Sequence, residues 1–193
     1  MAIMWDDIIS NSFWVLWAIF FAYWIISALR IKGVKSAETL GSRLSYGIPI
    51  WTAYALLLTN AHYWGPLSRH IYPQTLAIAL IGLALTAAGI GFAIWARYTL
   101  GTNWSSKITI KVDHELIRSG PYARIRHPIY TGILLALAGS ALAMAEPRGW
   151  LAVALALFAF YLKASREEQM LAQEFGERFA EHRQHTGFLL PRM

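Results

Sequence analysis

Five long stretches of the sequence contain no charged residue, and this feature limits the fold more than any other. They cover residues 13–29, 44–61, 72–96, 128–145 and 149–162. A helix that crosses the hydrocarbon core of a membrane needs about 20 mostly apolar residues, with a working range of about 17–25. The first four stretches meet this length, and the fifth meets it when it is extended to residue 168. We therefore predict an all-α integral membrane protein, a single membrane domain over residues 1–193 with five transmembrane helices at about 13–29, 44–63, 72–96, 128–145 and 149–168.

The composition supports burial in lipid and excludes several other classes of protein. Hydrophobic residues make up 56% of the chain and charged residues 15%. Soluble domains are about 45–50% apolar and about 25% charged. A disordered chain, a collagen-like repeat and a typical nucleic-acid-binding domain are excluded, despite a formal net charge of +6. The absence of cysteine excludes disulfides and thiolate metal sites.

The basic residues are divided unequally among the segments that join these stretches. Of the 17 Lys and Arg residues, only Arg69 and Arg148 fall in segments on one side, and the remaining 15 fall in the alternate segments. The cytoplasmic side of a membrane protein carries the excess of Lys and Arg. We therefore predict a multi-pass topology with the N-terminus outside and the C-terminus in the cytoplasm.

The fifth stretch is too short to cross a membrane without charged residues. Its length at 1.5 Å per residue is about 21 Å, against a hydrocarbon core of about 30 Å. A span that starts at Gly149 therefore includes Lys163, Arg166, Glu167 and Glu168. Ionisable residues at such depth usually face the bundle interior and mark a site. The alternative is a thinned bilayer, a snorkelling Lys163 and a purely structural ion pair with Glu167, four residues further along the same helix face.

A second polar region, DHELIRSGPYARIRHPIYTG at residues 113–132, leads into the fourth stretch. Pro128 suits a first helical turn, and a helix N-terminus offers unpaired amides that suit a carboxylate or a phosphate. The short connection at 146–149 makes the last two spans a tight antiparallel hairpin, which turns His127 and Tyr130 toward the helix end that carries Lys163. The alternative role of His127 is a hydrogen-bonded anchor at the membrane interface.

Other common catalytic motifs are missing from the sequence. The six histidines form no HExxH motif and no pair four residues apart on a predicted helix, so we predict no metal site. Ser119 has no GxSxG context, which argues against a serine nucleophile.

Two sequence blocks resemble a known family. HELIRSGPYARIRHPIYTG, followed by REEQMLAQEFGERF and a near-terminal Pro191, is similar to the isoprenylcysteine carboxyl methyltransferases, a family of integral-membrane methyltransferases. The likeness covers residues 100–191, and its two patterns, GxYxxxRHPxYxG and EExxLxxxFG, are specific in combination. Phospholipid N-methyltransferases and some sterol reductases share parts of this arrangement.

The resemblance implies that S-adenosyl-L-methionine binds in a pocket closed by the cytoplasmic segment and the tail. A lipophilic small molecule or prenylated substrate would enter from the bilayer, so the partners are this substrate and membrane lipids, with no nucleic acid. Lys163 and Arg166 take the catalytic positions, Lys163 as a cation toward the substrate carboxylate. The implied cofactor-binding residues are His114, Leu116, Ile117, Tyr122, His127, Pro128, Tyr130, Glu167 and Glu168. Phe179 and His182 depart from the family, which commonly has Tyr at both positions.

The chemistry of the acceptor stays open at this point. A carboxylate is already ionised and needs no general base, whereas an amine or a thiol would need Glu168 or His127 to remove a proton. Carboxyl methylation of an isoprenylcysteine-like molecule also has two alternatives that involve no methyl transfer. One is a nicotinamide-dependent lipid or sterol reductase with the same C-terminal architecture, and the other is a non-catalytic membrane binding protein.

Overall fold

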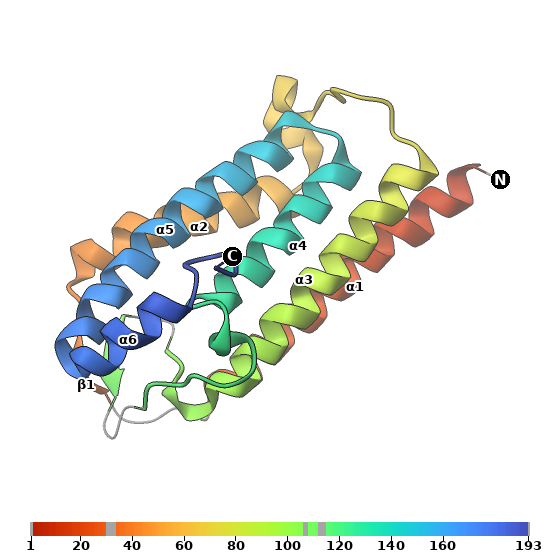
Figure 1. The fold of residues 1–193 in the computed structure, drawn as a ribbon. Helices are drawn as coiled ribbons and strands as arrows, with labels where there is room; N and C mark the ends of the chain where they lie inside the picture. Colours follow the sequence, from red (N-terminus) through yellow and green to blue (C-terminus); the bar gives the residue numbers. More distant parts are fainter. Residues whose placement is uncertain (1, 30–33, 106–107, 112–114, 193) are drawn as a thin grey trace.

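Long helices form almost the whole molecule, and their axes run roughly alongside one another (Figure 1). The structure is a computed structural model, and it describes residues 2–29, 34–105, 108–111 and 115–192. The α-helices are α1 (Ala2–Ala28), α2 (Leu40–Leu58), α3 (Leu76–Leu100), α4 (Pro128–Met144), α5 (Pro147–Phe175) and α6 (Glu177–His185). Three short 3₁₀ helices and two strands join them: η1 (Ala61–Ser68), η2 (Gly101–Asn103), η3 (Gly120–Ala123), β1 (Val34–Ala37) and β2 (Thr109–Lys111).

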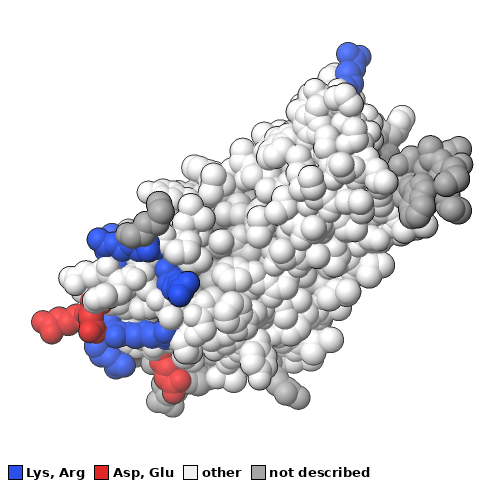
Figure 2. All heavy atoms as spheres, turned by 45° about the vertical axis from the view of Figure 1, so that its right-hand side comes forward, with Lys and Arg blue, Asp and Glu red and all other residues white. Residues whose placement is uncertain are grey.

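The long helices are apolar on their outer faces. Within the described residues, the helical segments Asp7–Ala28, Leu76–Asn103 and Pro147–Phe175 are long and apolar enough to cross a membrane, and α4 is apolar but shorter. Ile25, Trp51 and Phe158 are more than half exposed, which suits contact with lipid. Figure 2 shows the charged side chains of one face gathered at one end of the bundle, with a single basic group at the other end. The end that carries α6, β1 and β2 is called the charged end below.

Capping residues set several helix bounds that differ from the apolar stretches. Helix α2 begins at Leu40 because the Thr39 side chain accepts a hydrogen bond from the Ser42 amide, and it ends at Leu58, before the predicted 63. Helix α3 begins at Leu76 rather than 72, because Thr75 caps it in the same way. Helix α5 continues to Phe175, so residues 163–168 lie within a continuous helix rather than at its end.

Helices α3 and α4 approach each other through glycines, which fixes the start of α4 against α3. Gly82 and Gly89 of α3 face Gly139 and Gly132 of α4. A Cβ atom at any of the four would lie between 2.4 and 2.6 Å from a backbone atom of the other helix. No larger residue fits at this crossing without separating the two helices.

A buried polar group joins α1 to the same pair of helices. The Trp17 indole donates to the Ser140 hydroxyl over 3.1 Å, and this hydroxyl lies 3.1 Å from the Thr86 hydroxyl. All three side chains are almost completely buried. Hydrogen bonds among them satisfy polar atoms that lipid and core cannot satisfy.

The end of the bundle opposite the charged end is held by a buried arginine. Only Ala145 and Glu146 separate α4 from α5, and Ala145 adopts a left-handed conformation with a φ of 58°. Arg148 pairs with Glu146 and donates to the Leu56 and Thr59 carbonyls, over 2.9 and 2.8 Å, at the end of α2. Helices α2, α4 and α5 are therefore joined at one point.

Two non-helical features that the sequence analysis does not predict close the charged end. Strands β1 and β2 pair antiparallel and connect the α1–α2 loop to the segment that follows α3. The C-terminal residues return across the start of α4, where the Gly187 and Phe188 carbonyls accept the Arg126 and His127 amides over 2.9 and 3.2 Å. Figure 1 shows this tail lying in front of α4. The architecture is otherwise helical, as predicted.

Candidate active site

A cavity lies at the charged end, between the start of α4, the second half of α5, α6 and parts of the described segments 100–105, 108–111 and 115–117. Six of the residues predicted to bind a cofactor line it: Leu116, Ile117, Tyr122, His127, Tyr130 and Glu167. Two others do not. Pro128 is fully buried as the first residue of α4, and Glu168 lies behind His127. His114 lies outside the described residues.

Glu167 is the anionic centre of the cavity wall. The Tyr130 hydroxyl donates to its Oε1 over 2.7 Å, and His127 Nδ1 lies 3.5 Å from its Oε2. The Lys163 ammonium is 4.0 Å from Oε1. Residues of α4 and α5 that are 37 and 40 positions apart thus meet here, because the two helices form an antiparallel pair.

Glu168 occupies the other side of the same histidine. Its Oε1 lies 2.5 Å from Arg126 Nε and 3.3 Å from His127 Nε2, and its Oε2 lies 3.7 Å from Arg183 Nε. Both ring nitrogens of His127 therefore face a carboxylate, which suits a ring that donates from both nitrogens. Burial alone would lower the pKa of His127, but the hydrogen bonds to Glu167 and Glu168 outweigh it and raise that pKa.

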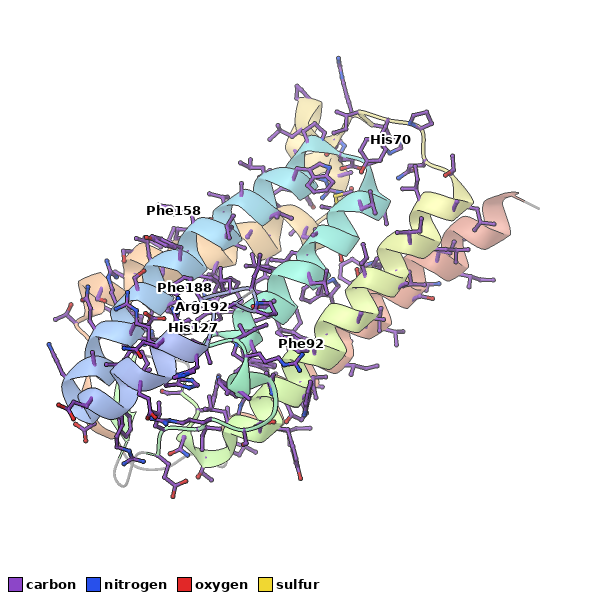
Figure 3. All side chains as sticks on the ribbon, in the orientation of Figure 1. His70, Phe92, His127, Phe158, Phe188 and Arg192 are labelled. Carbon is purple, nitrogen blue, oxygen red and sulfur yellow. The ribbon has the colours of Figure 1, made fainter. Side chains whose placement is uncertain are left out.

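Aromatic side chains hold His127 in this position. Its ring stacks on Tyr130 with centroids 5.6 Å apart and meets the edge of Phe188 at 5.0 Å. Figure 3 shows His127 and Phe188 close together where the tail crosses the start of α4. The Tyr130 ring in turn stacks on Phe160 of α5 at 4.7 Å. The tail therefore covers the side of His127 that does not face the cavity.

The two residues predicted to be catalytic are placed differently. Lys163 is 8% exposed, and its ammonium lies 5.3 Å from the centroid of the Tyr46 ring and 5.5 Å from that of Tyr130. Arg166 points to α2, where it donates to the Ser42 carbonyl over 2.9 Å and to the Ser45 hydroxyl over 2.6 Å. Lys163 therefore lies beside Glu167, whereas Arg166 faces α2, and neither of the two residues lines the cavity itself.

Sequence reasoning missed the wall that follows α3. Asn103, Trp104 and Ile108 line the cavity, and the Asn103 side chain accepts the Glu115 amide over 3.3 Å. The chain reverses here because Gly101 adopts a φ of 57°, which favours glycine. Gly101 and the polar residues that follow it indicate a turn, but they do not show which side chains enter the cavity.

Helix α6 supplies two more lining residues, Phe179 and His182. Both are buried, and they are the two residues that depart from the family pattern. Burial and the nearby arginines Arg118 and Arg126 lower the pKa of His182. The pKa values of the two histidines at the cavity are therefore shifted in opposite directions, that of His182 downward and that of His127 upward.

The cavity combines a carboxylate, cations and apolar and aromatic faces at the end of an apolar bundle. Within the described parts of the chain, no group of three or more His, Asp or Glu residues is arranged to hold a metal ion. Such a cavity suits an organic ligand that carries both charges and a flat apolar part. The fold and this site define a helical protein of the membrane class, with an ionic cavity at one end of its helices.

Comparison with known proteins identifies the family. A model of the isoprenylcysteine carboxyl methyltransferase (ICMT) family matches residues 80–173. A probable protein-S-isoprenylcysteine O-methyltransferase of Oryza sativa subsp. indica is 31% identical over 169 residues, which are 84% of this chain and 86% of the relative. Protein-S-isoprenylcysteine O-methyltransferase B of Arabidopsis thaliana is 29% identical over 167 residues, 83% of this chain and 82% of the relative. The corresponding protein of Homo sapiens is 26% identical over 155 residues, 79% of this chain and 53% of the relative.

The chain therefore belongs to the isoprenylcysteine carboxyl methyltransferase family. This confirms the resemblance drawn from the two motif blocks and the prediction of a membrane methyltransferase. Membership in this family and the apolar helices together make it an integral membrane protein.

Proposed function

We propose that this protein transfers a methyl group from S-adenosyl-L-methionine to the carboxylate of an isoprenylcysteine or a similar lipophilic molecule. The observation that carries the proposal is the Glu167 cluster, in which the partly buried carboxylate of Glu167, together with His127 and Tyr130, lines one cavity at the end of an apolar helix pair. The rice, Arabidopsis and human relatives are named protein-S-isoprenylcysteine O-methyltransferases, and these names supply the substrate class.

The chemistry of the cavity fits the proposed methyl donor. Glu167 offers a carboxylate to the donor's ammonium group, and His127 and Arg126 offer positive charge to its carboxylate. Leu116, Ile117 and the Tyr122 ring would flank the adenine. When bound, S-adenosyl-L-methionine supplies a methyl group attached to a positively charged sulfur.

The residues of the chain act by orienting the reactants and excluding water. Glu167 and Glu168 are both engaged by cations, so neither is positioned as a free general base. This arrangement favours an acceptor that is already ionised over an amine or a thiol, which would need to lose a proton. The buried cavity supplies orientation and removes water from the acceptor carboxylate, and these two effects lower the barrier.

The topology that best suits this site has five membrane helices, with the charged end in the cytoplasm. Helices α2 and α4 rise about 29 and about 26 Å at 1.5 Å per residue, close to the thickness of a hydrocarbon core. The excess of Lys and Arg on alternate segments favours an N-terminus outside and a C-terminus in the cytoplasm. The acceptor would then reach the cavity from the inner leaflet.

The test of the function is methyl transfer by the purified protein in detergent. Radiolabelled S-adenosyl-L-methionine is supplied with an N-acetylated S-prenylcysteine, with phosphatidylethanolamine or with a simple thiol. We expect labelled ester with the prenylcysteine only, and displacement of the donor by S-adenosylhomocysteine but not by NADPH. Glu167→Gln should abolish donor binding, while Glu177→Gln, at an exposed glutamate of α6, should leave it unchanged. Full donor binding in Glu167→Gln would refute the assignment.

A further inference from the structure

A carboxylate from the first half of the chain reaches the cavity region, outside residues 80–173 that the family model matches. Glu38 precedes α2, and its carboxylate accepts hydrogen bonds from the Tyr46 hydroxyl and from the Ser42 hydroxyl, the latter over 2.7 Å. It also accepts the backbone amide of Ile108 over 3.1 Å. Glu38 thus connects α2 to the segment that follows α3.

Tyr46 carries this connection to α5. It is 3% exposed, its hydroxyl is bound to Glu38, and its ring lies 5.3 Å from the Lys163 ammonium. The Tyr130 ring lies 5.5 Å from the same ammonium. A cation within about 6 Å of a ring centroid is attracted to the ring face. The two tyrosines therefore hold Lys163 from two helices, beside Glu167 at 4.0 Å.

Glu38 is connected to residues of the cavity wall by two series of contacts. One reaches Ile108 directly, and the other passes through Tyr46 and Lys163 to Glu167. Ile108 and Glu167 both line the cavity, but they belong to different walls, the segment after α3 and helix α5. Glu38 therefore links the two walls by hydrogen bonds, in addition to the direct packing of Ile108 near Ala159 and Met170 of α5.

We propose that Glu38 and Tyr46 are positioning residues for the methyl donor. They hold Ile108, Lys163 and Glu167 in the positions in which the donor binds. This inference rests on the proposed function. Glu38 fixes Ile108 and the Tyr46 ring, and that ring keeps Lys163 from moving away from Glu167. The two walls are held at the separation that the donor requires, before the donor binds. Neither residue touches the reacting atoms.

The test separates donor affinity from turnover and from folding. Glu38→Gln replaces an acceptor oxygen by an NH₂ group, and Tyr46→Phe removes the hydroxyl but keeps the ring. We expect each variant to raise the KM for S-adenosyl-L-methionine about tenfold, which is the effect of one lost hydrogen bond to a charged group. The kcat at saturating donor and the KM for the prenylcysteine should stay within about twofold. The double variant should raise that KM by less than the product of the two single effects, because Glu38 and Tyr46 share a hydrogen bond.

Thr39→Ala is the matched control. It removes the cap of α2 one residue from Glu38, so it should lower the thermal midpoint without raising the KM for the donor. An equal rise of that KM in Thr39→Ala, an unchanged KM in Glu38→Gln, or a rise confined to the KM of the acceptor would each overturn the inference. Wild-type protein that binds no S-adenosyl-L-methionine would refute the proposed function and this inference together. Wild-type turnover with an unaffected Glu38→Gln variant would refute this inference alone.

Discussion

Replacing Gly89 by alanine should separate α3 from α4 and disturb the site that they carry. The added Cβ would lie 2.4 Å from the Ala136 amide nitrogen and 2.5 Å from the Gly132 carbonyl oxygen. Ordinary van der Waals contact begins at 3.4 Å, so the helices must move apart by about 1 Å. Both contacts are to backbone atoms, and no side chain can rotate away to relieve them.

The expected change in the free energy of unfolding is the sum of two opposing contributions. Forcing an extra carbon into a packed core costs about 3 kcal/mol at the upper end of the usual range. Alanine stabilises a helix relative to glycine by at most about 1 kcal/mol, which offsets part of this cost. The net loss is about 2 kcal/mol, and in a chain of this size it lowers the thermal midpoint by about 4–8 °C.

Gly91→Ala provides the control on the same helix, because no atom lies within 4 Å of a Cβ at this position. Thermal midpoints in detergent should therefore fall for Gly89→Ala and stay equal or rise slightly for Gly91→Ala. Methyl transfer should fall with the first variant, since α4 carries His127 at its N-terminus. Equal midpoints for the two variants would show that the glycine crossing does not hold these helices together.

Three further predictions follow from the charged groups. The pKa of His127 is raised in the folded protein, so protonated His127 stabilises the fold fully below about pH 6.5, and this contribution is lost as the pH rises through the raised pKa. The thermal midpoint of the wild-type protein should therefore fall on the alkaline side of a pH series. His127→Gln should remove that pH dependence. Arg148→Met leaves Glu146 buried with only the more distant His70 side chain, at 3.8 Å, among its basic neighbours in the described residues, and should cost about 3 kcal/mol in thermal or denaturant unfolding. The KM for the methyl donor, measured on the folded fraction, should stay at the wild-type value. Because the chain has no native cysteine, Arg69→Cys and Arg178→Cys each introduce a single site for labelling. A membrane-impermeant maleimide applied to intact cells should modify the cysteine at position 69 and not the one at position 178. The opposite result would reverse the proposed orientation.

The positions of the helices could be predicted because uncharged stretches of membrane length have few alternatives. Their ends could not, because they depend on single hydrogen bonds such as those of the Thr39 and Thr75 side chains. The apolar stretch gives no sign that α2 stops at Leu58 and is followed by η1. The strands β1 and β2 were missed for a different reason, since strands of four and three residues carry too little periodicity to detect.

The residues of the candidate site that could be named from the sequence all lie in the two motif blocks. Adjacent residues on a helix point about 100° apart, so Arg166 and Glu168 project to opposite sides of Glu167. The sequence does not show which of them faces α2, and the structure places Arg166 there. Trp104 and the pair Glu38–Tyr46 lie outside both blocks and reach the site through chain reversals, whose direction no local pattern determines.

The meeting of the two motif blocks is itself a consequence of the hairpin. In two antiparallel helices joined by a short turn, residues equally far from the turn lie opposite each other. The midpoint between His127 and Glu167 is position 147, where α5 begins, and the midpoint between Tyr130 and Lys163 falls between 146 and 147. The spacing that separates the blocks is therefore the length of chain needed to go along α4 and return along α5 to the same level. A histidine and a glutamate 40 residues apart form an ion pair here because the connection between their helices has only two residues.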